Sequence, residues 1–289
     1  MPNPFVLVED DRYVLYASQI GIYDPTIQVR TSDTLDQWGP PTDAMPQVPA
    51  WVAAGFTWAP DVRRVGDTYA MWFTARVKAL EDPPTQCIGV AFADDALGPF
   101  VGDPEPLVCQ LDRRGSIDPR SFAAEDGTLW LHWKSDDNAD VDGTTTSSIY
   151  AQRLSVDARR LIGDPTRILE VDQPWEGRIV EAPHMLRRPD GRHWLWYSGN
   201  WFNQAAYGIG VAECEGPAGP CRKPFDGPWL ASNAQGDGPG ESSHVVDHEG
   251  RVWILYSPLA QQFETTTKRP VAMARVGFDE RGPYLAAAD

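Results

Sequence analysis

Apolar and polar positions alternate along this chain in short runs, and these runs recur as hairpins. Each hairpin has an apolar strand, a polar turn and a second strand rich in aromatic residues. The second strands of five such units begin at Tyr13, Tyr69, Trp130, Trp194 and Trp253, at intervals of 56, 61, 64 and 59 residues. Alternation with a period of two predicts strands, and no segment shows a convincing helical period of 3.6.

Each of the five units continues into a third strand, and most continue into a looser fourth. The third strands are predicted at residues 27–30, 88–92, 149–152, 207–211 and 271–275. A long repeat built from short strands is typical of a β-propeller, in which each unit forms one blade. The sequence therefore predicts an all-β, five-bladed β-propeller that occupies residues 1–289 as a single domain. A two-sheet sandwich is the alternative, but it gives no reason for a five-fold period.

The starts of the first strands are candidate site positions, because the first strands of a propeller line its central channel. A proline can occupy the first position of a strand without losing a ladder hydrogen bond. Pro4, Pro60, Pro119 and Pro183 fit such positions. The residues beside them should face one another across one mouth of the channel: Asn3, Ala59, Asp118 and, one position further back, Glu181.

Composition narrows the classes of function. The chain has 41 acidic and 25 basic residues, a net charge of −16 and no basic run, which argues against nucleic-acid binding. No apolar run is long enough to span a membrane. The first residues do not resemble a signal peptide, so the location stays open between cytoplasmic and secreted after loss of a leader. The absence of a GxSxG motif argues against a serine hydrolase.

The four cysteines leave two arrangements open. Cys214 and Cys221 flank a loop rich in Gly and Pro and could close it as a disulfide. Cys87 and Cys109 could pair, or could remain buried thiols. No CxxC motif is present, so we do not expect a zinc site.

Several motifs, taken in order along the chain, resemble glycoside hydrolase family 43. They are Thr57-Trp58-Ala59-Pro60-Asp61-Val62, Ser116-Ile117-Asp118-Pro119, Val180-Glu181-Ala182-Pro183-His184, Tyr197-Ser198-Gly199-Asn200 and, in the first unit, Ser32-Asp33-Thr34-Leu35-Asp36-Gln37-Trp38. The resemblance implies a five-bladed propeller that hydrolyses α-L-arabinofuranosides or β-D-xylosides, or their oligomers, with inversion at the anomeric carbon. The partner would be an oligosaccharide or polysaccharide, and no cofactor is required. The linkage, exo or endo action and the oligomeric state stay open.

The resemblance also implies three catalytic positions. Glu181 matches the general acid, and Asp118 matches a carboxylate that raises the pKa of the acid and orients it. In inverting enzymes the two carboxyl groups lie about 6.5–9.5 Å apart, which leaves room for a water on the far face of the sugar. A like charge nearby makes Glu181 harder to ionise and keeps its proton available. Glu176 is the alternative candidate for the general acid. In a non-catalytic interpretation, both Glu176 and Glu181 are solvated loop carboxylates.

The position of the base departs from the family pattern. Asn3 stands where the family has an aspartate, and an amide cannot accept the proton of the attacking water. Asn3 could replace an original aspartate to trap a complex, the chain could be a naturally weakened relative, or Asp24 or Asp61 could serve as the base. Asp61 follows its proline, so we expect it to bind backbone amides instead. The alternative function is a carbohydrate-binding propeller without turnover.

Other residues are candidates for binding. Trp58 could form a sugar platform or pack within its blade. Asn200 and Trp201 lie in the connection of the fourth unit, where Trp201 could shape a subsite, and Arg269 resembles a family arginine that reaches substrate hydroxyls. A family Gly-His that helps to hold a channel Ca²⁺ or Na⁺ is matched here by Glu241. Glu241 or His244 could contact such an ion, or neither, so no metal ligand is assigned.

Overall fold

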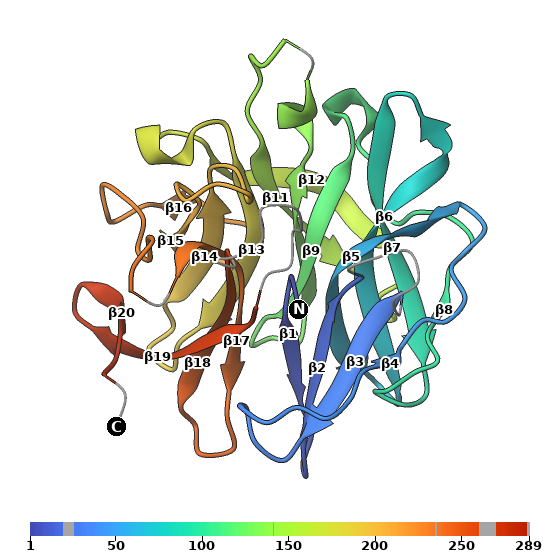
Figure 1. Ribbon diagram of the computed structural model, residues 1–289, viewed down its shortest axis with the longest axis horizontal. Helices are drawn as coiled ribbons and strands as arrows, with labels where there is room; N and C mark the ends of the chain where they lie inside the picture. The colour runs from blue at the N-terminus through green and yellow to red at the C-terminus, as the bar shows by residue number, and fades with distance from the viewer. Residues whose placement is uncertain (20–25, 141, 235, 260–269, 288–289) are drawn as a thin grey trace.

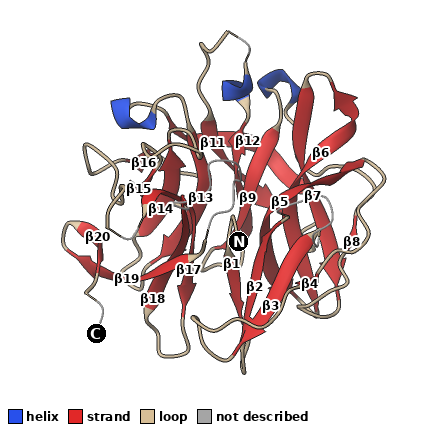
Figure 2. Ribbon diagram, in the orientation of Figure 1, coloured by secondary structure: helices blue, strands red, loops and turns tan. Residues whose placement is uncertain are grey.

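The chain folds into five antiparallel four-stranded sheets arranged around a central axis (Figure 1). The computed structural model describes residues 1–19, 26–140, 142–234, 236–259 and 270–287. The prediction of an all-β, five-bladed β-propeller is confirmed. Helix in the described residues is limited to three short 3-10 turns, Leu111–Arg113, Asp137–Ala139 and Pro174–Glu176, which lie in loops at one side of the molecule (Figure 2).

Each blade consists of four strands that follow one another in the chain. Blade one contains β1 (Phe5–Val8), β2 (Tyr13–Ser18), β3 (Ile27–Ser32) and β4 (Thr42–Asp43). Blade two contains β5 (Val52–Val65), β6 (Thr68–Glu81), β7 (Pro84–Ala93) and β8 (Val101–Gly102). Blade three contains β9 (Ser116–Ala123), β10 (Leu129–Ser135), β11 (Ser148–Leu154) and β12 (Leu161–Glu170). Blade four contains β13 (Val180–Arg187), β14 (His193–Gly199), β15 (Gly208–Cys214) and β16 (Cys221–Arg222). Blade five contains β17 (Asp237–Val246), β18 (Val252–Leu259), β19 (Ala272–Asp279) and β20 (Gly282–Leu285).

The periodicity of the sequence corresponds to the register of the first two strands in each blade. The five aromatic residues that open the second strands pair with the outer part of the first strands: Tyr13 with Val8, Tyr69 with Arg64, Trp130 with Phe122, Trp194 with Leu186 and Trp253 with Val245. One hairpin geometry is therefore repeated five times, and it brings equivalent sequence positions to equivalent places around the axis.

Five apolar clusters hold neighbouring blades together. Each cluster joins two blades, through pairs such as Tyr16 with Phe73, Trp72 with Trp133, Ile149 with Tyr197, Trp196 with Ile254 and Leu15 with Leu255. A fully buried apolar side chain of this size contributes about 1.5–3 kcal/mol. Packing between the sheets therefore supplies the stability that fixes the blades around the channel.

The ring of blades closes without a shared strand. All four strands of blade one come from the first part of the chain, and all four of blade five come from the last part. Strand β1 contacts β17, and their apolar residues join one cluster with Leu15 and Leu255. Side-chain packing and a few polar contacts therefore close this boundary.

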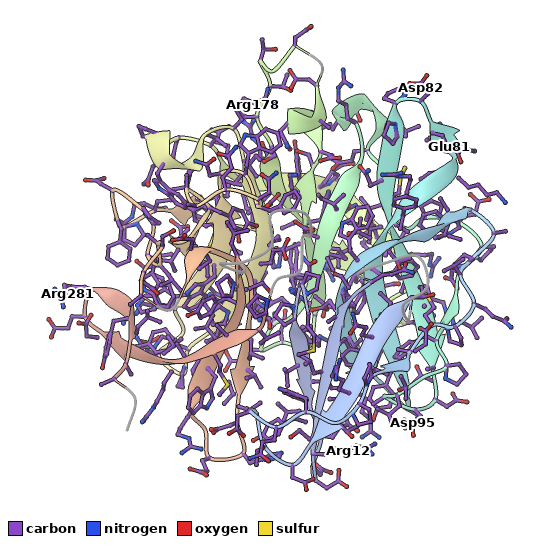
Figure 3. The ribbon with its side chains drawn as sticks, in the orientation of Figure 1. Arg12, Glu81, Asp82, Asp95, Arg178 and Arg281 are labelled. Carbon is purple, nitrogen blue, oxygen red and sulfur yellow. A yellow bond between two sulfur atoms is a disulfide. The ribbon has the colours of Figure 1, made fainter. Side chains whose placement is uncertain are left out.

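Both pairs of cysteines form disulfides. Cys214 and Cys221 close the loop between β15 and β16, as the sequence suggested, and Cys87 pairs with Cys109. Charged side chains such as Glu81, Asp82, Asp95 and Arg281 project from the outer edge of the blades (Figure 3). Among the described residues, no helix has the length and apolar character needed to cross a membrane.

Candidate active site

The inner ends of the five first strands share one unusual backbone conformation. Asn3, Ala59, Asp118, Ala182 and Glu241 have φ angles of 50°, 50°, 56°, 48° and 53°. We call these five the ring residues. Non-glycine residues seldom adopt the left-handed region, and such strain is concentrated at functional sites. The register of the strand pairs shifts beside the ring residue in blades two to five, so a local bulge re-aims the chain there.

The backbone N–H of every ring residue donates to a side chain of the preceding structural unit. In three blades the acceptor is a hydroxyl: Ala59 donates to Ser18 Oγ, Asp118 to Thr74 Oγ1 and Glu241 to Ser198 Oγ, each over 2.9 Å. In the other two blades the acceptor is a carboxylate of the neighbouring ring residue. Ala182 donates to Asp118 Oδ2 over 3.1 Å, and Asn3 donates to Glu241 Oε2 over 3.2 Å.

Lys134 explains why Asp118 accepts the bond from Ala182. Lys134 is on β10 and pairs with Ile117 of β9. It occupies the place that Ser18, Thr74 and Ser198 hold in their own blades. An ammonium group has no lone pair to accept an N–H. The carboxylate of Asp118 takes over this function and is held beside the residue that follows Glu181.

Asp118 and Glu181 therefore lie together, as the sequence analysis expected. Both residues are buried, with exposures of 7% and 8%. Tyr207 Oη donates to Glu181 Oε1 over 2.7 Å, and Lys134 Nζ lies 3.2 Å from Glu181 Oε2. Lys134 also pairs with Asp136 over 3.3 Å. Two carboxylates and one ammonium thus share a buried polar cluster.

Burial and like charge act on the protonation of this cluster. Burial, followed by the charge of Glu181, raises the pKa of Asp118 from 3.8 to about 7, against the opposing effect of Lys134. Burial alone would lower the pKa of Lys134, but the charges of Glu181, Asp136 and Asp118 outweigh it and raise that pKa above its ordinary value. The lysine therefore stays charged, and the carboxyl pair retains a proton close to neutral pH.

Asn3 is held firmly at the matching position of blade one. Its Oδ1 accepts a hydrogen bond from Ser18 Oγ over 2.7 Å, and the same hydroxyl accepts the N–H of Ala59. The side chain is buried, with 7% exposure. Blade one therefore presents an amide at the place where blade three presents a carboxylate.

Of the two carboxylates considered as alternatives, Asp61 has structural contacts. Asp61 is 1% exposed; its Oδ2 accepts the N–H of Ser121 over 2.9 Å, and its Oδ1 lies 3.6 Å from Arg120. This agrees with the expectation that Asp61 binds backbone amides, and it ties blade two to blade three. Arg120 also donates to the carbonyl of Pro60 over 3.0 Å. Asp24 lies outside the described residues.

Glu176 is not a solvated loop carboxylate, because it is fully buried. It accepts the backbone N–H groups of Asp172 and Gln173 over 3.0 and 3.1 Å, and the hydroxyl of Tyr197 over 2.7 Å. Lys223 Nζ lies 2.6 Å from Oε1, the oxygen that also accepts from Tyr197. Through these partners, Glu176 holds the loop before β13 in place.

The candidate binding residues have different surroundings. Trp58 lies opposite Thr74, one position before the ring residue of blade two, which is the place that Glu181 holds in blade four. Trp201 is 37% exposed. Asn200 uses its amide within the chain, since it donates to the carbonyl of Trp175 and accepts the N–H of Trp201, each over 2.9 Å. Arg269 lies outside the described residues.

The described residues do not offer a ready metal site. No group of three or more His, Cys, Asp or Glu side chains among them could hold an ion. His244 is buried against Trp196, and burial, then the charge of Arg120, lowers its pKa to about 3. Neither of its ring nitrogens has a hydrogen-bond partner within the described part of the chain. A single neutral imidazole does not form a ligand set for a metal ion.

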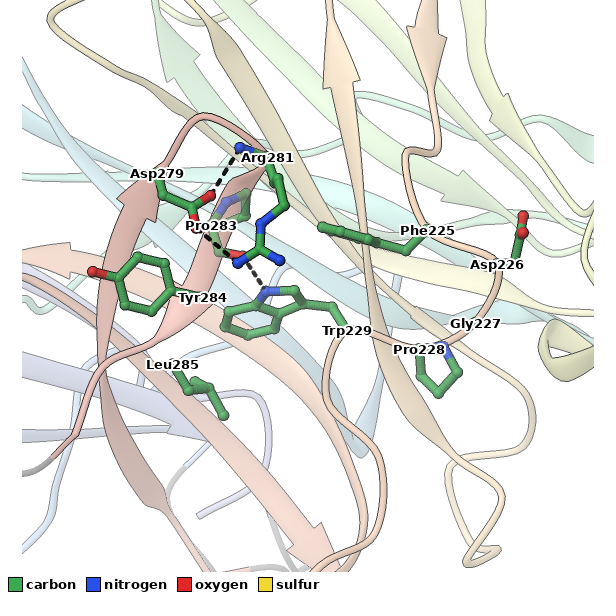
Figure 4. A pocket seen from close by; sticks show the side chains of 10 residues that line it. All are labelled: Phe225, Asp226, Gly227, Pro228, Trp229, Asp279, Arg281, Pro283, Tyr284 and Leu285. Atoms are coloured by element: carbon green, nitrogen blue, oxygen red, sulfur yellow. Dashed lines mark hydrogen bonds and ion pairs between the residues drawn. The ribbon is translucent and has the colours of Figure 1, made fainter.

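A separate pocket lies on the outer side of blades four and five (Figure 4). It has a volume of about 560 Å³ and is lined in part by Phe225, Trp229 and Tyr284. Its Asp279 is paired with Arg281 over 3.1 Å, and Trp229 donates to the carbonyl of Pro283. This pocket does not contain the Asp118–Glu181 pair.

Sequence reasoning missed Lys134, Tyr207 and the contact of Glu241 with Asn3. A signal for Lys134 was available, because the aligned units end their second strands with Phe73-Thr74, Tyr197-Ser198 and Tyr256-Ser257 but with Trp133-Lys134 in blade three. The sequence places Tyr207 at the start of a predicted strand, 207–211, but β15 begins at Gly208, so Tyr207 lies in the loop before it.

Comparison with known proteins finds relatives with named activities. The chain is 25% identical over 212 residues to "Extracellular endo-alpha-(1->5)-L-arabinanase 2" of Bacillus subtilis (strain 168). This match covers 64% of this chain and 40% of that protein. It is 22% identical over 223 residues to "Beta-xylosidase" of Xylanibacter ruminicola, which covers 68% of this chain and 64% of that protein. The chain thus spans less than two thirds of either relative.

A solved structure described as a thermostable family-43 glycoside hydrolase superposes with a TM-score of 0.86 and 26% identity, over 99% of this chain and 93% of that one. The α-L-arabinofuranosidase from Lactobacillus brevis shares the fold, with a TM-score of 0.80 and 19% identity over 98% and 92% of the two chains. The family model "Glycosyl hydrolases family 43" matches residues 1–284. This chain therefore belongs to glycosyl hydrolase family 43.

Proposed function

We propose that this chain hydrolyses glycosidic bonds of arabinan- or xylan-type carbohydrates with inversion at the anomeric carbon. The observation that carries the proposal is the buried pair of Asp118 and Glu181 near the starts of β9 and β13. The named activities of the relatives, an arabinanase and a xylosidase, support this class of substrate.

In this proposal Glu181 is the general acid. It gives its proton to the oxygen of the leaving sugar, and the negative charge that remains on Glu181 is stabilised by Lys134 and by the hydroxyl of Tyr207. Asp118 lies beside this acid with its pKa raised to about 7, first by burial and then by the charge of Glu181. One carboxyl of the pair is therefore supplied with a proton near neutral pH.

A second candidate function follows from Asn3. Because an amide cannot take the proton of water, a chain that relied on residue 3 would bind carbohydrate without hydrolysing it. Hydrolysis requires a carboxylate at another residue. The two functions differ in one measurable property, which is turnover.

The test compares the wild type with Glu181→Gln on two substrates, a nitrophenyl glycoside and the matching unsubstituted oligosaccharide. General acid catalysis contributes about 10²–10⁴-fold. We expect a loss of this size on the oligosaccharide and a smaller loss on the nitrophenyl glycoside, whose leaving group needs less protonation. Proton NMR of the first product should show the inverted anomer.

Glu125→Gln serves as the control for loss of a carboxylate. Glu125 is exposed and lies in the turn between β9 and β10 of blade three, next to the blade that carries Glu181. Equal losses on both substrates would contradict the acid role of Glu181. Absence of turnover in the wild type and in Asn3→Asp, together with oligosaccharide binding by calorimetry, would favour the binding propeller.

A further inference from the structure

Glu241 carries a carboxylate across the boundary between blade five and blade one. Its backbone belongs to β17, but its Oε2 lies 3.2 Å from the backbone nitrogen of Asn3. An aspartate at residue 3 would extend from that same backbone. The longer side chain of Glu241 thus brings a carboxylate next to the position where Asn3 presents only an amide.

The backbone of Glu241 is also linked to the proposed acid. Its N–H donates to Ser198 Oγ over 2.9 Å, and Ser198 is the residue that pairs with Glu181 across β13 and β14. Two glutamates from neighbouring blades therefore flank one serine. Glu241 is half-buried, whereas Asp118 and Glu181 are buried, so water has access to it more readily.

The charge of Glu241 reaches the same cluster. After burial and the charge of Glu181, it is a further cause of the raised pKa of Asp118. Asp61, the other described candidate, does not match this placement, since it is engaged by Ser121 and Arg120. Among the five ring residues, only Asp118 and Glu241 are carboxylates, and Asp118 is bound to Ala182 beside the acid.

We infer that Glu241 is the general base of this chain and takes the place of the missing carboxylate at residue 3. The inference rests on the proposed hydrolysis. The oxygen of a water attacks the anomeric carbon, and the proton of that water passes to Glu241. The bond from the anomeric carbon to the leaving oxygen breaks with its electron pair on that oxygen, which takes the proton of Glu181. Both glutamates then return to their starting states by exchange of protons with solvent.

The experiment compares Glu241→Gln with Asn3→Asp and with the double variant that carries both changes. We expect Glu241→Gln to lower kcat by about 10²–10⁴-fold with KM within a few-fold, because a base acts on the chemical step. The double variant should recover at least about tenfold of that loss, because it returns a carboxylate to the neighbouring ring residue. Glu249→Gln, in the exposed turn of the same blade, is the matched control and should retain the wild-type rate.

The outcomes separate the inference from the proposed function. A Glu241→Gln variant with wild-type kcat would overturn the role of Glu241 while hydrolysis itself stands. A wild type without turnover that gains it through Asn3→Asp would also overturn that role, and would support the proposed function with residue 3 as base. A loss in Glu241→Gln that the double variant does not reverse would assign Glu241 a positioning role, against the inference. Failure of the proposed function is read separately, from Glu181→Gln.

Discussion

Lys134 Nζ lies 3.2 Å from Glu181 Oε2, although the two residues come from different blades. This lysine is 2% exposed and stands where other blades have a serine or threonine. A single substitution in the repeat thus places a positive charge beside two buried carboxyl groups. Several measurable consequences arise from this arrangement.

Replacing Lys134 by methionine should destabilise the fold, and more so in alkaline than in acidic solution. Removal of one partner from a buried ion pair costs about 3–5 kcal/mol, because the other charge remains buried and unpaired. At about pH 5 the carboxyl of Asp118, whose pKa burial and then the charge of Glu181 raise to about 7, is protonated, and this removes one of the buried negative charges. Urea unfolding at about pH 5 and about pH 8 measures the difference. The exposed Lys78→Met is the control, and equal losses at both pH values would contradict the account.

Replacing Asp118 by asparagine should change the pH dependence of stability. The pKa of Asp118 is raised from 3.8 to about 7 by burial and then by Glu181, so the folded state binds this proton more tightly than the unfolded state. The free energy of unfolding of the wild type therefore falls, through this group, as pH rises across that window. Relative to the wild type, Asp118→Asn should gain stability between about pH 4 and about pH 8, as measured by urea unfolding.

The control for that experiment is Asp126→Asn. The pKa of Asp126 is lowered, chiefly by hydrogen bonds from Thr128, so its contribution is lost as pH falls and the change has the opposite sign. Parallel pH curves for the wild type and Asp118→Asn would show that Asp118 does not hold a proton in the folded chain.

Replacing Tyr207 by phenylalanine should slow catalysis while the fold is kept. The change removes the hydroxyl that donates to Glu181 Oε1 over 2.7 Å. Hydrogen bonds to charged groups contribute about 1.5–3 kcal/mol, so kcat should fall by about tenfold or more. Steady-state kinetics on an oligosaccharide would measure the effect. Tyr284→Phe, at the separate outer pocket, removes an equivalent hydroxyl and should leave kcat unchanged; similar effects of both changes would rule out a specific role for Tyr207.

Replacing Gly240 by alanine should disturb the same tyrosine. A Cβ at Gly240 would lie 1.8 Å from a ring carbon of Tyr207, so the ring must move and its bond to Glu181 must stretch. Overpacking of this kind costs about 1–3 kcal/mol of stability. We expect a lower Tm together with a lower kcat. A Cβ at Gly227 meets nothing within 4 Å, so Gly227→Ala is the control; a G240A protein with unchanged kcat would refute the coupling.

The sequence was sufficient to predict the five-fold repeat, but it did not predict the contacts around the ring residues. The five second-strand aromatics recur at nearly equal intervals, and this pattern indicates the number of blades because every blade buries the same hairpin positions. Prolines at the strand starts likewise located Asn3, Ala59 and Asp118 at one rim. A repeat carries this information because each unit has the same backbone.

The contacts that distinguish the blades depend on side-chain length and direction, which no repeat encodes. The sequence analysis connected Glu241 with an ion, since nothing in its neighbours reveals that its carboxylate reaches Asn3. Tyr207 lies 26 positions from Glu181, and a loop rather than a strand pattern brings its hydroxyl to the acid. Burial of Glu176 was also hidden, because its four partners come from two loops and a strand.

Blades one and five meet along a boundary that no described strand crosses, and the hydrogen bond from the Asn3 N–H to Glu241 bridges it. The boundary between blades one and five can therefore open while the hydrogen bonds within each sheet remain intact. The inferred base, Glu241, lies at this boundary between blades five and one. Mild heat or dilute denaturant should therefore abolish turnover while the far-ultraviolet circular dichroism spectrum still shows the native β-strand content.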